Sequence, residues 1–242
     1  MKAYLSMGMG VNSVAMMLLL LDQKEDFEAI FVDHGGDWPE TYEYFDMFQN
    51  WLINKGHKKI TVLKPAYKYK GKIHDNIYTC YIENGLIPLR YPRWCTKNFK
   101  IDAIMDYVKS PCFQMIGIDA SESHRAKIST EKGIENRYPL IEHDINRYGC
   151  KALIESKGLP VPMKSGCYFC PFQRISQFDL LRRKHPKLFC KVEQLESNNI
   201  RLNKPKGKNI SYIKNIPIRK AINEDQKMLF EEEEYPPCHC GL

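Results

Sequence analysis

A glycine-rich turn near the amino terminus has the residue types that bind phosphate. It reads Ser6-Met7-Gly8-Met9-Gly10-Val11-Asn12-Ser13 and stands between a short apolar segment and a predicted helix. Gly8 and Gly10 permit unusual backbone angles and close approach of a ligand, while Ser6, Ser13 and the free amides of a helix start attract anions. Because the Gly-Lys-Ser ending of a Walker A loop is missing, the turn predicts a phosphate site of another kind.

A cysteine pair is the second candidate for chemistry. Cys167 and Cys170 have two residues between them, which is the spacing of half a tetrahedral metal site or half an iron–sulfur site. The start of the chain lacks the pattern of a signal peptide, and the longest apolar run, Val14 to Leu21, is too short to cross a bilayer. We therefore expect a cytoplasmic protein that does not enter the membrane. In that reducing compartment clustered thiols bind metal more often than they pair, with a redox dithiol or simple buried thiols as alternatives.

Both motifs need a scaffold, and the first half of the chain predicts one. Strand-like apolar runs alternate with helical patterns; the strands are expected at 2–5, 29–32, 59–63 and 112–118, and the helices at 11–21, 39–55 and 97–108. This alternation predicts an α/β fold with a doubly wound, mostly parallel sheet, whose ligands bind at the carboxyl ends of the strands.

The second half of the chain has a different texture, with prolines between short helical patterns. We predict a nucleotide-binding domain over 1–137, a smaller helical, cysteine-containing and basic region over 138–230, and a mobile tail over 231–242. The formal net charge is +7, and residues 201–220 hold seven Lys or Arg and no acid. Such a stretch favours polyanions such as nucleotides or nucleic acid, and a solvated surface is the alternative.

Several further segments fit one family in order along the chain. They are Val32-Asp33-His34-Gly35-Gly36-Asp37-Trp38-Pro39-Glu40-Thr41-Tyr42, Arg93-Trp94-Cys95-Thr96-Lys97 with Lys100, Gly117-Ile118-Asp119 through Glu122-Ser123-His124-Arg125, Tyr138-Pro139-Leu140, and Cys167-Tyr168-Phe169-Cys170-Pro171-Phe172. With the first turn they make residues 4 to 173 resemble the phosphoadenosine phosphosulfate (PAPS) reductase family of PP-loop, adenine nucleotide alpha-hydrolase-like proteins. The last segment is similar to that of a phage- and prophage-associated branch.

The resemblance implies a bound adenine nucleotide. It would lie between the loop from Ser6 to Ser13, Asn12 included, and the strand end that holds Asp33 and Gly35. Cationic groups would complete an anion pocket; they are Arg93, Lys97, Lys100 and Arg125. The chain departs from the family at Asn12, where ATP-cleaving members carry an Asp that helps to hold magnesium, and at Asp119, where a basic residue is usual.

The resemblance also implies that Cys95 joins Cys167 and Cys170 around a metal. The family's iron–sulfur reductases have adjacent cysteines at the first position, whereas this chain has only Cys95 there, so a fourth ligand is missing. Cys150 is the first candidate, and an iron site left open for sulfide or substrate is the second. A [4Fe-4S] cluster is expected on family grounds, with zinc as the alternative. Cys240, in a Cys-Gly-Leu ending similar to that of sulfonucleotide reductases, is a candidate nucleophile.

Two versions of sulfur chemistry follow from this resemblance. In one, ATP with Mg²⁺ activates an acceptor such as DNA or tRNA at the α-phosphate, and sulfur from a donor is then inserted. In the other, a sulfonucleotide (PAPS or APS) is reduced through Cys240 with the help of a thiol reductant. A nucleic-acid-binding regulator that keeps the nucleotide pocket is an alternative, as is an NAD-dependent oxidoreductase built on Gly8, Gly10 and Asp33. A homodimer is compatible with each. The sulfur-chemistry versions require the glycine turn and the thiol turn to meet at one cleft.

Overall fold

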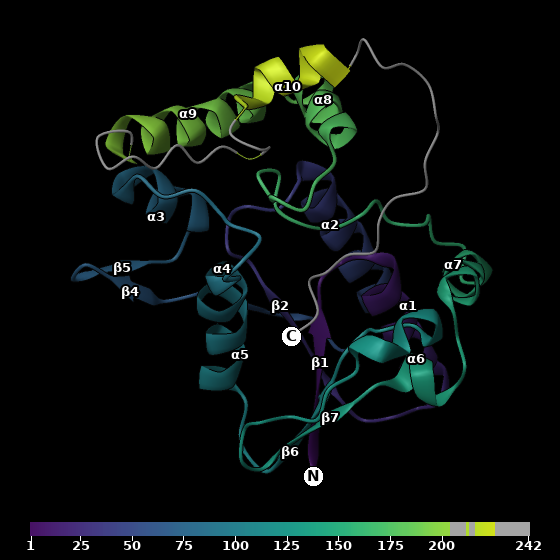
Figure 1. Ribbon diagram of the computed structural model, residues 1–242. Helices are drawn as coiled ribbons and strands as arrows, with labels where there is room; N and C mark the ends of the chain where they lie inside the picture. The colour runs from purple at the N-terminus through teal and green to yellow at the C-terminus, as the bar shows by residue number, and fades with distance from the viewer. Residues whose placement is uncertain (204–211, 213–215, 226–242) are drawn as a thin grey trace.

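A five-stranded parallel sheet lies at the centre of the computed structural model, which describes residues 1–203, 212 and 216–225 (Figure 1). The strands are β1 (Lys2–Met7), β2 (Glu28–Val32), β3 (Thr61–Leu63), β6 (Cys112–Met115) and β7 (Ile134–Arg137), in the order β3-β2-β1-β6-β7. Leu5 in the central strand is in register with Ala29 on one side and Met115 on the other. The chain first builds outward through β2 and β3 and then returns to add β6 and β7, so the strand order reverses between β1 and β6. The carboxyl ends of strands at such a reversal form a crevice for ligands.

Alternate residues of the central strands face two different layers. Leu5 and Phe31 belong to a hydrophobic cluster with the apolar helix α1 (Val11–Asp22), on which α7 (Arg147–Ser156) packs. Their neighbours Tyr4 and Ile30 belong to a separate cluster with Ile104 of α5. Because side chains alternate across a strand, these two sets of residues face opposite sides of the sheet, and each side is covered by a helix. The predicted doubly wound α/β sheet is thus confirmed.

A third hydrophobic cluster lies beyond the carboxyl ends of the strands, where three helices from late in the chain meet earlier segments (Figure 1). The late helices are α8 (Ile175–Lys184), α9 (Pro186–Asn203) and α10 (Ile218–Asp225). They pack on one another, and α9 also packs on α3 (Ile77–Asn84). The remaining elements are α2 (Pro39–Asn54), β4 (Tyr67–Tyr69), β5 (Lys72–His74), α4 (Trp94–Thr96), the π-helical turn Lys97–Ile101, α5 (Asp102–Tyr107), the 3-10 turn Ala120–Arg125 and α6 (Pro139–Glu142).

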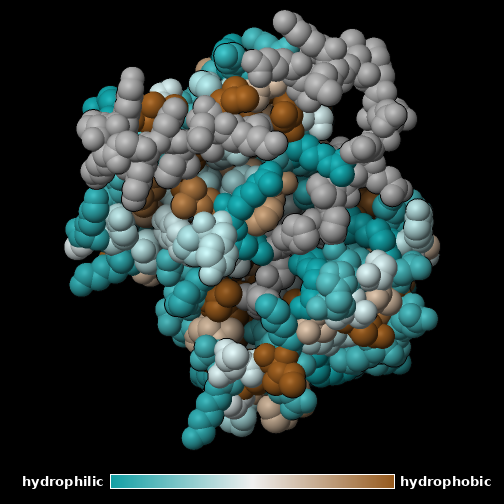
Figure 2. Space-filling view, in the orientation of Figure 1, coloured by the Kyte–Doolittle hydropathy of each residue, from teal (hydrophilic) through white to brown (hydrophobic). Residues whose placement is uncertain are grey.

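The four predicted strands are all present, and each predicted helix is found with shifted ends. The edge strand β7 and the small hairpin of β4 and β5 were not predicted. The division predicted at residue 137 stays a prediction, although α7 shares the core of the sheet with α1. Among the described residues, no helix combines the length and the apolarity needed to span a membrane. Where its residues are coloured, the face in Figure 2 shows hydrophobic side chains in small separate patches among hydrophilic ones, as water-facing surfaces usually do.

Candidate functional site

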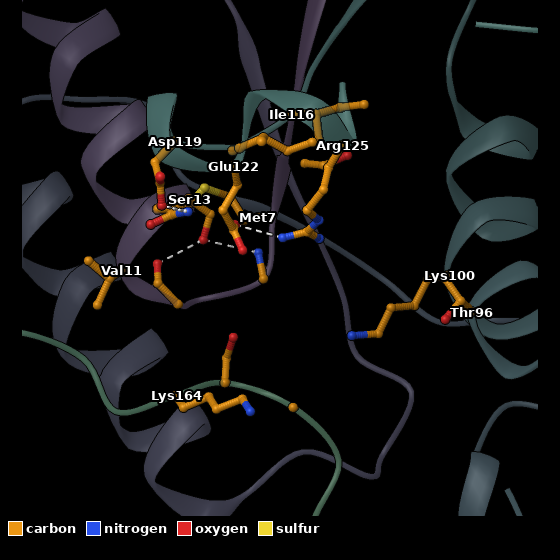
Figure 3. Close-up of a pocket in the computed structure, with 18 of the residues that line it drawn as sticks. Met7, Val11, Ser13, Thr96, Lys100, Ile116, Asp119, Glu122, Arg125 and Lys164 are labelled. Atoms are coloured by element: carbon orange, nitrogen blue, oxygen red, sulfur yellow. Dashed lines mark hydrogen bonds and ion pairs between the residues drawn. The ribbon is translucent and has the colours of Figure 1, made fainter. Parts of the chain in front are cut away.

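A cavity of about 500 Å³ opens where the strand order reverses. One wall is the loop from Ser6 to Ser13, a second is the segment after β6 from Ile116 to Arg125, and a third is Lys164-Ser165-Gly166 (Figure 3). Of the predicted nucleotide-binding residues, the following line it: Ser6, Gly8, Gly10, Asn12, Ser13, Lys100 and Arg125. The volume is within the range of small-molecule and cofactor sites.

The glycine turn directs the start of α1 toward this cavity. Gly10 is the N-cap of α1 and supplies no side-chain hydrogen bond, and the first turn of the helix holds no acidic residue. Ser13 stabilises the turn from inside, because its hydroxyl accepts from the Gly8 amide at 3.3 Å and donates to the Gly10 carbonyl at 3.0 Å. Met9 has a positive φ of 55°, a left-handed conformation that tightens the bend. The helix dipole and the amides of the first turn make this end of α1 suitable for an anion.

Gly117 at the end of β6 allows the loop to approach the sheet. A Cβ at this position would lie 3.0 Å from the Ser13 nitrogen and 3.2 Å from the Asn12 carbonyl carbon, both of them backbone atoms that cannot easily move. Only glycine therefore fits where the first turn of α1 crosses β6. Gly117 stands in the Gly-Ile-Asp segment that resembles the family, so the sequence could have indicated this close approach, but Gly117 was not among the predicted site residues.

Cationic side chains from four separate segments line the cavity. Lys100 lies in the π-helical turn between α4 and α5, and Arg125 ends the 3-10 turn; both point toward the glycine loop (Figure 3). Arg147 at the start of α7 and Lys164 were not predicted, because they come from parts of the sequence without a phosphate-binding pattern. Arg125 is held by Glu122 at 2.6 Å, with both side chains mostly buried. Such a ring of cations suits a polyanionic ligand.

Asn12 connects the loop to two charged residues. Its amide nitrogen donates to Asp119 Oδ2 at 2.8 Å, and its amide oxygen accepts from Arg147 at 2.7 Å. Asp119 is 2% exposed, and it also accepts from the Ser121 amide at 3.0 Å. An aspartate at position 12 would place a second carboxylate against Asp119. Two of the residues at which the chain departs from the family pattern are therefore neighbours in space, and the amide of one donates to the carboxylate of the other.

The other predicted nucleotide ligands lie outside the cavity wall. Asp33 is engaged by Lys64 at 2.6 Å and by the hydroxyl of Tyr42 at 2.9 Å, and these contacts lower its pKa although burial alone would raise it. Lys97 is exposed and pairs with Asp102 at 2.8 Å. The guanidinium of Arg93 lies 5.1 Å from the ring of Phe172. Roles for these three residues and for Gly35 in nucleotide binding stay predictions.

Three of the predicted metal ligands gather next to the cavity. Cys167 directly follows its Lys164-Ser165-Gly166 wall, and the Cys170 amide donates to the Cys167 carbonyl at 3.1 Å in a tight turn. Cys95 and Cys167 both pack against the third hydrophobic cluster. The side chain of Ser165 closely faces the glycine turn, since a Cβ on Gly10 would lie 2.8 Å from its Oγ. The expected meeting of the glycine turn and the thiol segment is thus confirmed.

Cys150 is placed elsewhere. It is fully buried in α7, within the hydrophobic cluster that includes α1, and burial raises the pKa of its thiol to about 12, with Asp119 adding to the effect. The structure does not bring it to the other three cysteines. The prediction failed because spacing along the sequence gives no information on which face of a helix a cysteine occupies. Cys240 lies outside the described residues.

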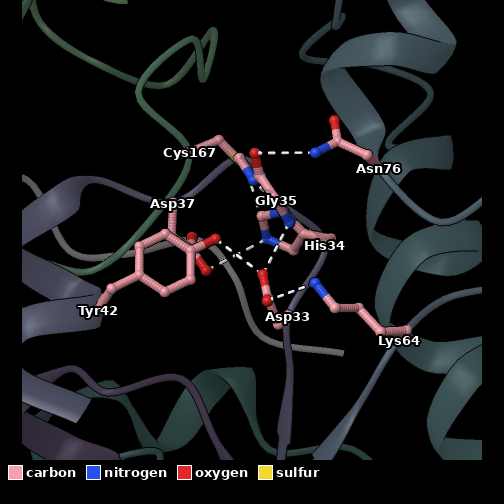
Figure 4. A network of polar contacts seen from close by, with 9 residues as sticks. Asp33, His34, Gly35, Asp37, Tyr42, Lys64, Asn76 and Cys167 are labelled. Atoms are coloured by element: carbon pink, nitrogen blue, oxygen red, sulfur yellow. Dashed lines mark hydrogen bonds and ion pairs between the residues drawn. The ribbon is translucent and has the colours of Figure 1, made fainter. Parts of the chain in front are cut away.

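A buried polar network surrounds Cys167 (Figure 4). Cys167 Sγ is 3.7 Å from His34 Nε2, which is 3.4 Å from Asp37 Oδ2. Burial opposes ionisation of Asp37, but His34 and Lys100 outweigh it and lower the pKa of this carboxyl to about 2. Burial, with help from Asp37, raises the pKa of the Cys167 thiol well above its usual value. Without a metal this thiol is therefore a poor nucleophile.

The surroundings of the cysteines fit a metal centre. Within the described residues, only His34, Asp37 and Cys167 place three metal-binding atoms mutually within 4.8 Å. The three cysteines are spread more widely, whereas thiolates on one tetrahedral zinc are about 3.8 Å apart at the usual bond length. The hydroxyls of Tyr81 and Tyr212 are buried; that of Tyr81 interacts with Cys95, and that of Tyr212 has no hydrogen-bond partner in the described part of the chain. Burial first, then nearby Cys95 and Cys167, raise the pKa of Tyr81. The wide separation of the three thiols and the buried hydroxyl groups beside them suit an iron–sulfur cluster, whose surface is rich in sulfide acceptors.

The sequence matches the model of the phosphoadenosine phosphosulfate reductase domain over residues 2–136, which is more than half of the chain. The protein belongs to the PAPS reductase domain family. The matched region contains the sheet, the glycine loop and Cys95, so the predicted family is confirmed. The thiol turn at Cys167 lies beyond it.

Two individual proteins are also similar. An uncharacterized protein of Methanocaldococcus jannaschii is 24% identical over 200 residues, which are 75% of this chain but only 44% of that relative. The chain thus spans less than half of its relative's length. The structure of the U34-tRNA thiolase NcsA from Methanococcus maripaludis with its [4Fe-4S] cluster is 19% identical, and the similarity covers 84% of this chain and 72% of that one with a TM-score of 0.43. A TM-score this low does not establish a shared function.

Proposed function

We propose that this PAPS reductase-like chain is an enzyme of sulfur chemistry that activates an acceptor with ATP beside a cysteine-held iron–sulfur cluster. One observation supports this most: Lys164-Ser165-Gly166 is a wall of the cavity at the glycine loop, and the next residue is Cys167. A nucleotide in the cavity and a metal at the thiols would therefore be separated by one short segment.

The cavity has separate groups for the parts of a nucleotide. The amides at the start of α1 and the hydroxyl of Ser6 would bind a phosphate, because the helix dipole attracts an anion there and the first turn of the helix has no acidic residue of its own. Lys100, Arg125 and Lys164 would bind the remaining phosphate oxygens and stabilise the charge on a leaving pyrophosphate. The adenine ring would occupy the apolar part of the wall, which includes Ile116 and Ile118.

Two carboxylates among these cations favour ATP over a sulfonucleotide. Asp119 and Glu122 line the same cavity as the anion-binding residues. A carboxylate beside a phosphate is repelled unless a divalent cation lies between them, and Mg²⁺ is commonly bound by one or two carboxylates together with substrate phosphates. A magnesium nucleotide explains their presence. For a sulfonucleotide that binds without a metal, they would only weaken the affinity.

The proposed reaction has two parts. An oxygen of the acceptor attacks the α-phosphorus of ATP, the bond from that phosphorus to the bridging oxygen breaks, and pyrophosphate leaves with the electron pair. A sulfur atom at sulfide oxidation level, supplied by a donor, then displaces AMP from the activated atom of the acceptor, a carbon in tRNA or a phosphorus in DNA, and AMP leaves with the former acceptor oxygen. The cluster would supply a binding position for that sulfur. The protein's own residues hold the nucleotide, neutralise pyrophosphate and keep the reacting groups next to Cys167.

The test is anaerobic purification followed by incubation with either nucleotide. We expect iron and sulfide in the pure protein, and release of pyrophosphate and AMP from ATP in the presence of acceptor. Lys100→Ala should reduce turnover about a hundredfold, while Lys58→Ala, which removes an exposed lysine paired with Asp26, should not change it. Consumption of PAPS with no consumption of ATP would reject this proposal in favour of sulfonucleotide reduction through Cys240.

The acceptor is proposed to be a nucleic acid, either tRNA or DNA. The support is the net charge of +7 and the basic stretch over 201–220, of which the structure describes only a part. Binding to tRNA and to duplex DNA, measured across a salt series, would identify it by a steep loss of affinity with salt. Tight salt-dependent binding without any turnover of ATP would instead favour the regulator.

A further inference from the structure

The three gathered cysteines leave one ligand of a four-ligand metal centre unassigned. Structural zinc sites and four-iron clusters both take four protein ligands as a rule. Cys150 does not fill the position, because it is buried in α7 within another hydrophobic cluster. One alternative is an iron site left open for sulfide or substrate, and the other is a ligand from a side chain that already lies beside Cys95, Cys167 or Cys170.

The backbone places Asp37 next to Cys167. The two residues form an antiparallel bridge, and hydrogen bonds on both sides extend it: Trp38 donates to the Gly166 carbonyl at 3.2 Å, and Tyr168 donates to the Gly36 carbonyl at 3.0 Å. The segment after β2 is therefore pinned to the thiol turn. Asp37 is 5% exposed, so its carboxylate is directed into the protein rather than to water.

His34 selects which oxygen of Asp37 is available. The Gly36 amide donates to His34 Nδ1 at 3.1 Å, so Nδ1 carries the lone pair and the proton is on Nε2. Nε2–H then faces Asp37 Oδ2 at 3.4 Å. A protonated Nε2 cannot bind a metal, so His34 is a positioning residue for the carboxylate. Among the described residues the other oxygen, Asp37 Oδ1, is buried without any hydrogen-bond partner.

His34 and Lys100 stabilise the charge of Asp37, but its buried Oδ1 accepts no hydrogen bond from the described residues, and a metal ion would give this oxygen a partner. We propose that Asp37 is the fourth protein ligand of the metal centre, through Oδ1, with Cys95, Cys167 and Cys170 as the other three and His34 holding Oδ2. This inference rests on the proposed cluster. A carboxylate is a harder and weaker ligand for iron than a thiolate. An iron held by Asp37 would therefore be the most easily exchanged one, and a sulfur species could replace the carboxylate as its ligand.

The experiment loads the full chain anaerobically with isotope-enriched iron and records Mössbauer spectra. The wild-type spectrum should contain one iron site whose isomer shift marks a ligand other than thiolate. In Asp37→Cys that site should become indistinguishable from the others, and in Asp37→Asn the cluster should lose this iron on mild oxidation at least tenfold faster than in the wild type. Cys150→Ala should give the wild-type spectrum.

Two results would overturn the inference, and they differ from failure of the proposed function. A distinct iron site that is unchanged in Asp37→Cys would show that water or another group holds it, and a wild-type spectrum with only thiolate-ligated iron would show that Asp37 is not a ligand. Asp37→Cys keeps the test decisive if Asp37→Asn does not fold. Absence of iron and sulfide from the wild-type protein would instead remove the cluster itself, and with it the proposed function.

Discussion

At the scale of single residues, the pairing of Asn12 with Asp119 explains two departures from the family pattern at once. A carboxylate that family members carry on the loop is here supplied from the end of β6, and an amide replaces it on the loop. The amide is suited to this place because it can donate to Asp119 and accept from Arg147 together. Neither an aspartate nor a leucine could do both.

Exchanging these two groups tests that explanation. Asn12→Asp alone should weaken ATP binding at least tenfold, or ~1.4 kcal/mol, because the new carboxylate meets Asp119 in a partly buried place where the amide had donated to it. Asp119→Asn alone should also weaken it. The double variant Asn12→Asp with Asp119→Asn should recover most of the affinity in isothermal titration calorimetry. Simple additivity of the two losses would refute the compensation.

Gly117 provides a second test at this scale. Gly117→Ala should lower the free energy of unfolding by about 1–3 kcal/mol and weaken ATP binding, because the new methyl group must displace the backbone of the loop at Ser13. Gly8→Ala is the matched control, since its Cβ would meet only the Ser165 hydroxyl at 3.9 Å. Chemical denaturation of both variants would measure the difference, and equal losses would argue against steric contact at Gly117.

At the scale of elements, two arginines attach the Cys95 segment to the thiol turn. Arg90 donates to the Pro171 carbonyl at 2.8 Å, and the guanidinium groups of Arg90 and Arg93 lie 5.9 and 5.1 Å from the ring of Phe172. Segments that are far apart in the sequence thus meet around one aromatic side chain. This contact, rather than cysteine spacing, brings the third thiol to the pair.

Removal of that aromatic ring should therefore release metal. Phe172→Ala is expected to reduce the iron content after purification by about half or more, because Cys95 loses its fixed position relative to Cys170. Phe113→Ala is a suitable control: Phe113 is also a phenylalanine beside an arginine, Arg137, but it lies in β6 away from the cysteines. Equal iron contents in the two variants, measured by emission spectrometry, would contradict the role of Phe172.

The sequence predicted the elements better than it predicted how they meet. The four strands carry apolar runs strong enough to be recognised locally, and the glycine turn follows the first of them. β7 escaped prediction because only Ile134 among its residues is strongly apolar, and the hairpin of β4 and β5 because its residues are mostly Lys and Tyr. Arg147, Lys164 and Asp37 reach their places through chain crossings and strand pairing. No local pattern records such long-range placement, and for the same reason Cys150 was wrongly expected near the thiol pair.

At the scale of the whole molecule, Cys95 and Cys167 lie in the helical layer beyond the carboxyl ends of the strands and not in the cores of the sheet. The late helices and α3 share a hydrophobic cluster with Cys95 and Cys167, while the sheet has its own cores. A metal that joins the thiols therefore stabilises chiefly the layer beyond the carboxyl ends of the strands. We expect the sheet to keep its fold without the metal.

Removal of the metal should reveal this difference. A metal whose free concentration is about a thousand times its Kd adds about 4 kcal/mol to the free energy of unfolding. Its loss should therefore lower the Tm on the order of 10 °C. Hydrogen exchange should accelerate in α8, α9 and the segment 164–173, and should be unchanged in β1 and β6. Uniform acceleration throughout the chain would show instead that the two layers unfold as one unit.

The wall made of Lys164, Ser165 and Gly166 touches the glycine loop with one side and continues into Cys167 at its end. A shift of this short segment would move both a wall of the cavity and Cys167. If the proposed metal fixes the position of this segment, it also fixes one wall of the cavity, and thermodynamic reciprocity requires nucleotide and metal to change each other's affinity by the same factor. Under the proposed function, the supply of iron would then set how strongly the protein binds its nucleotide.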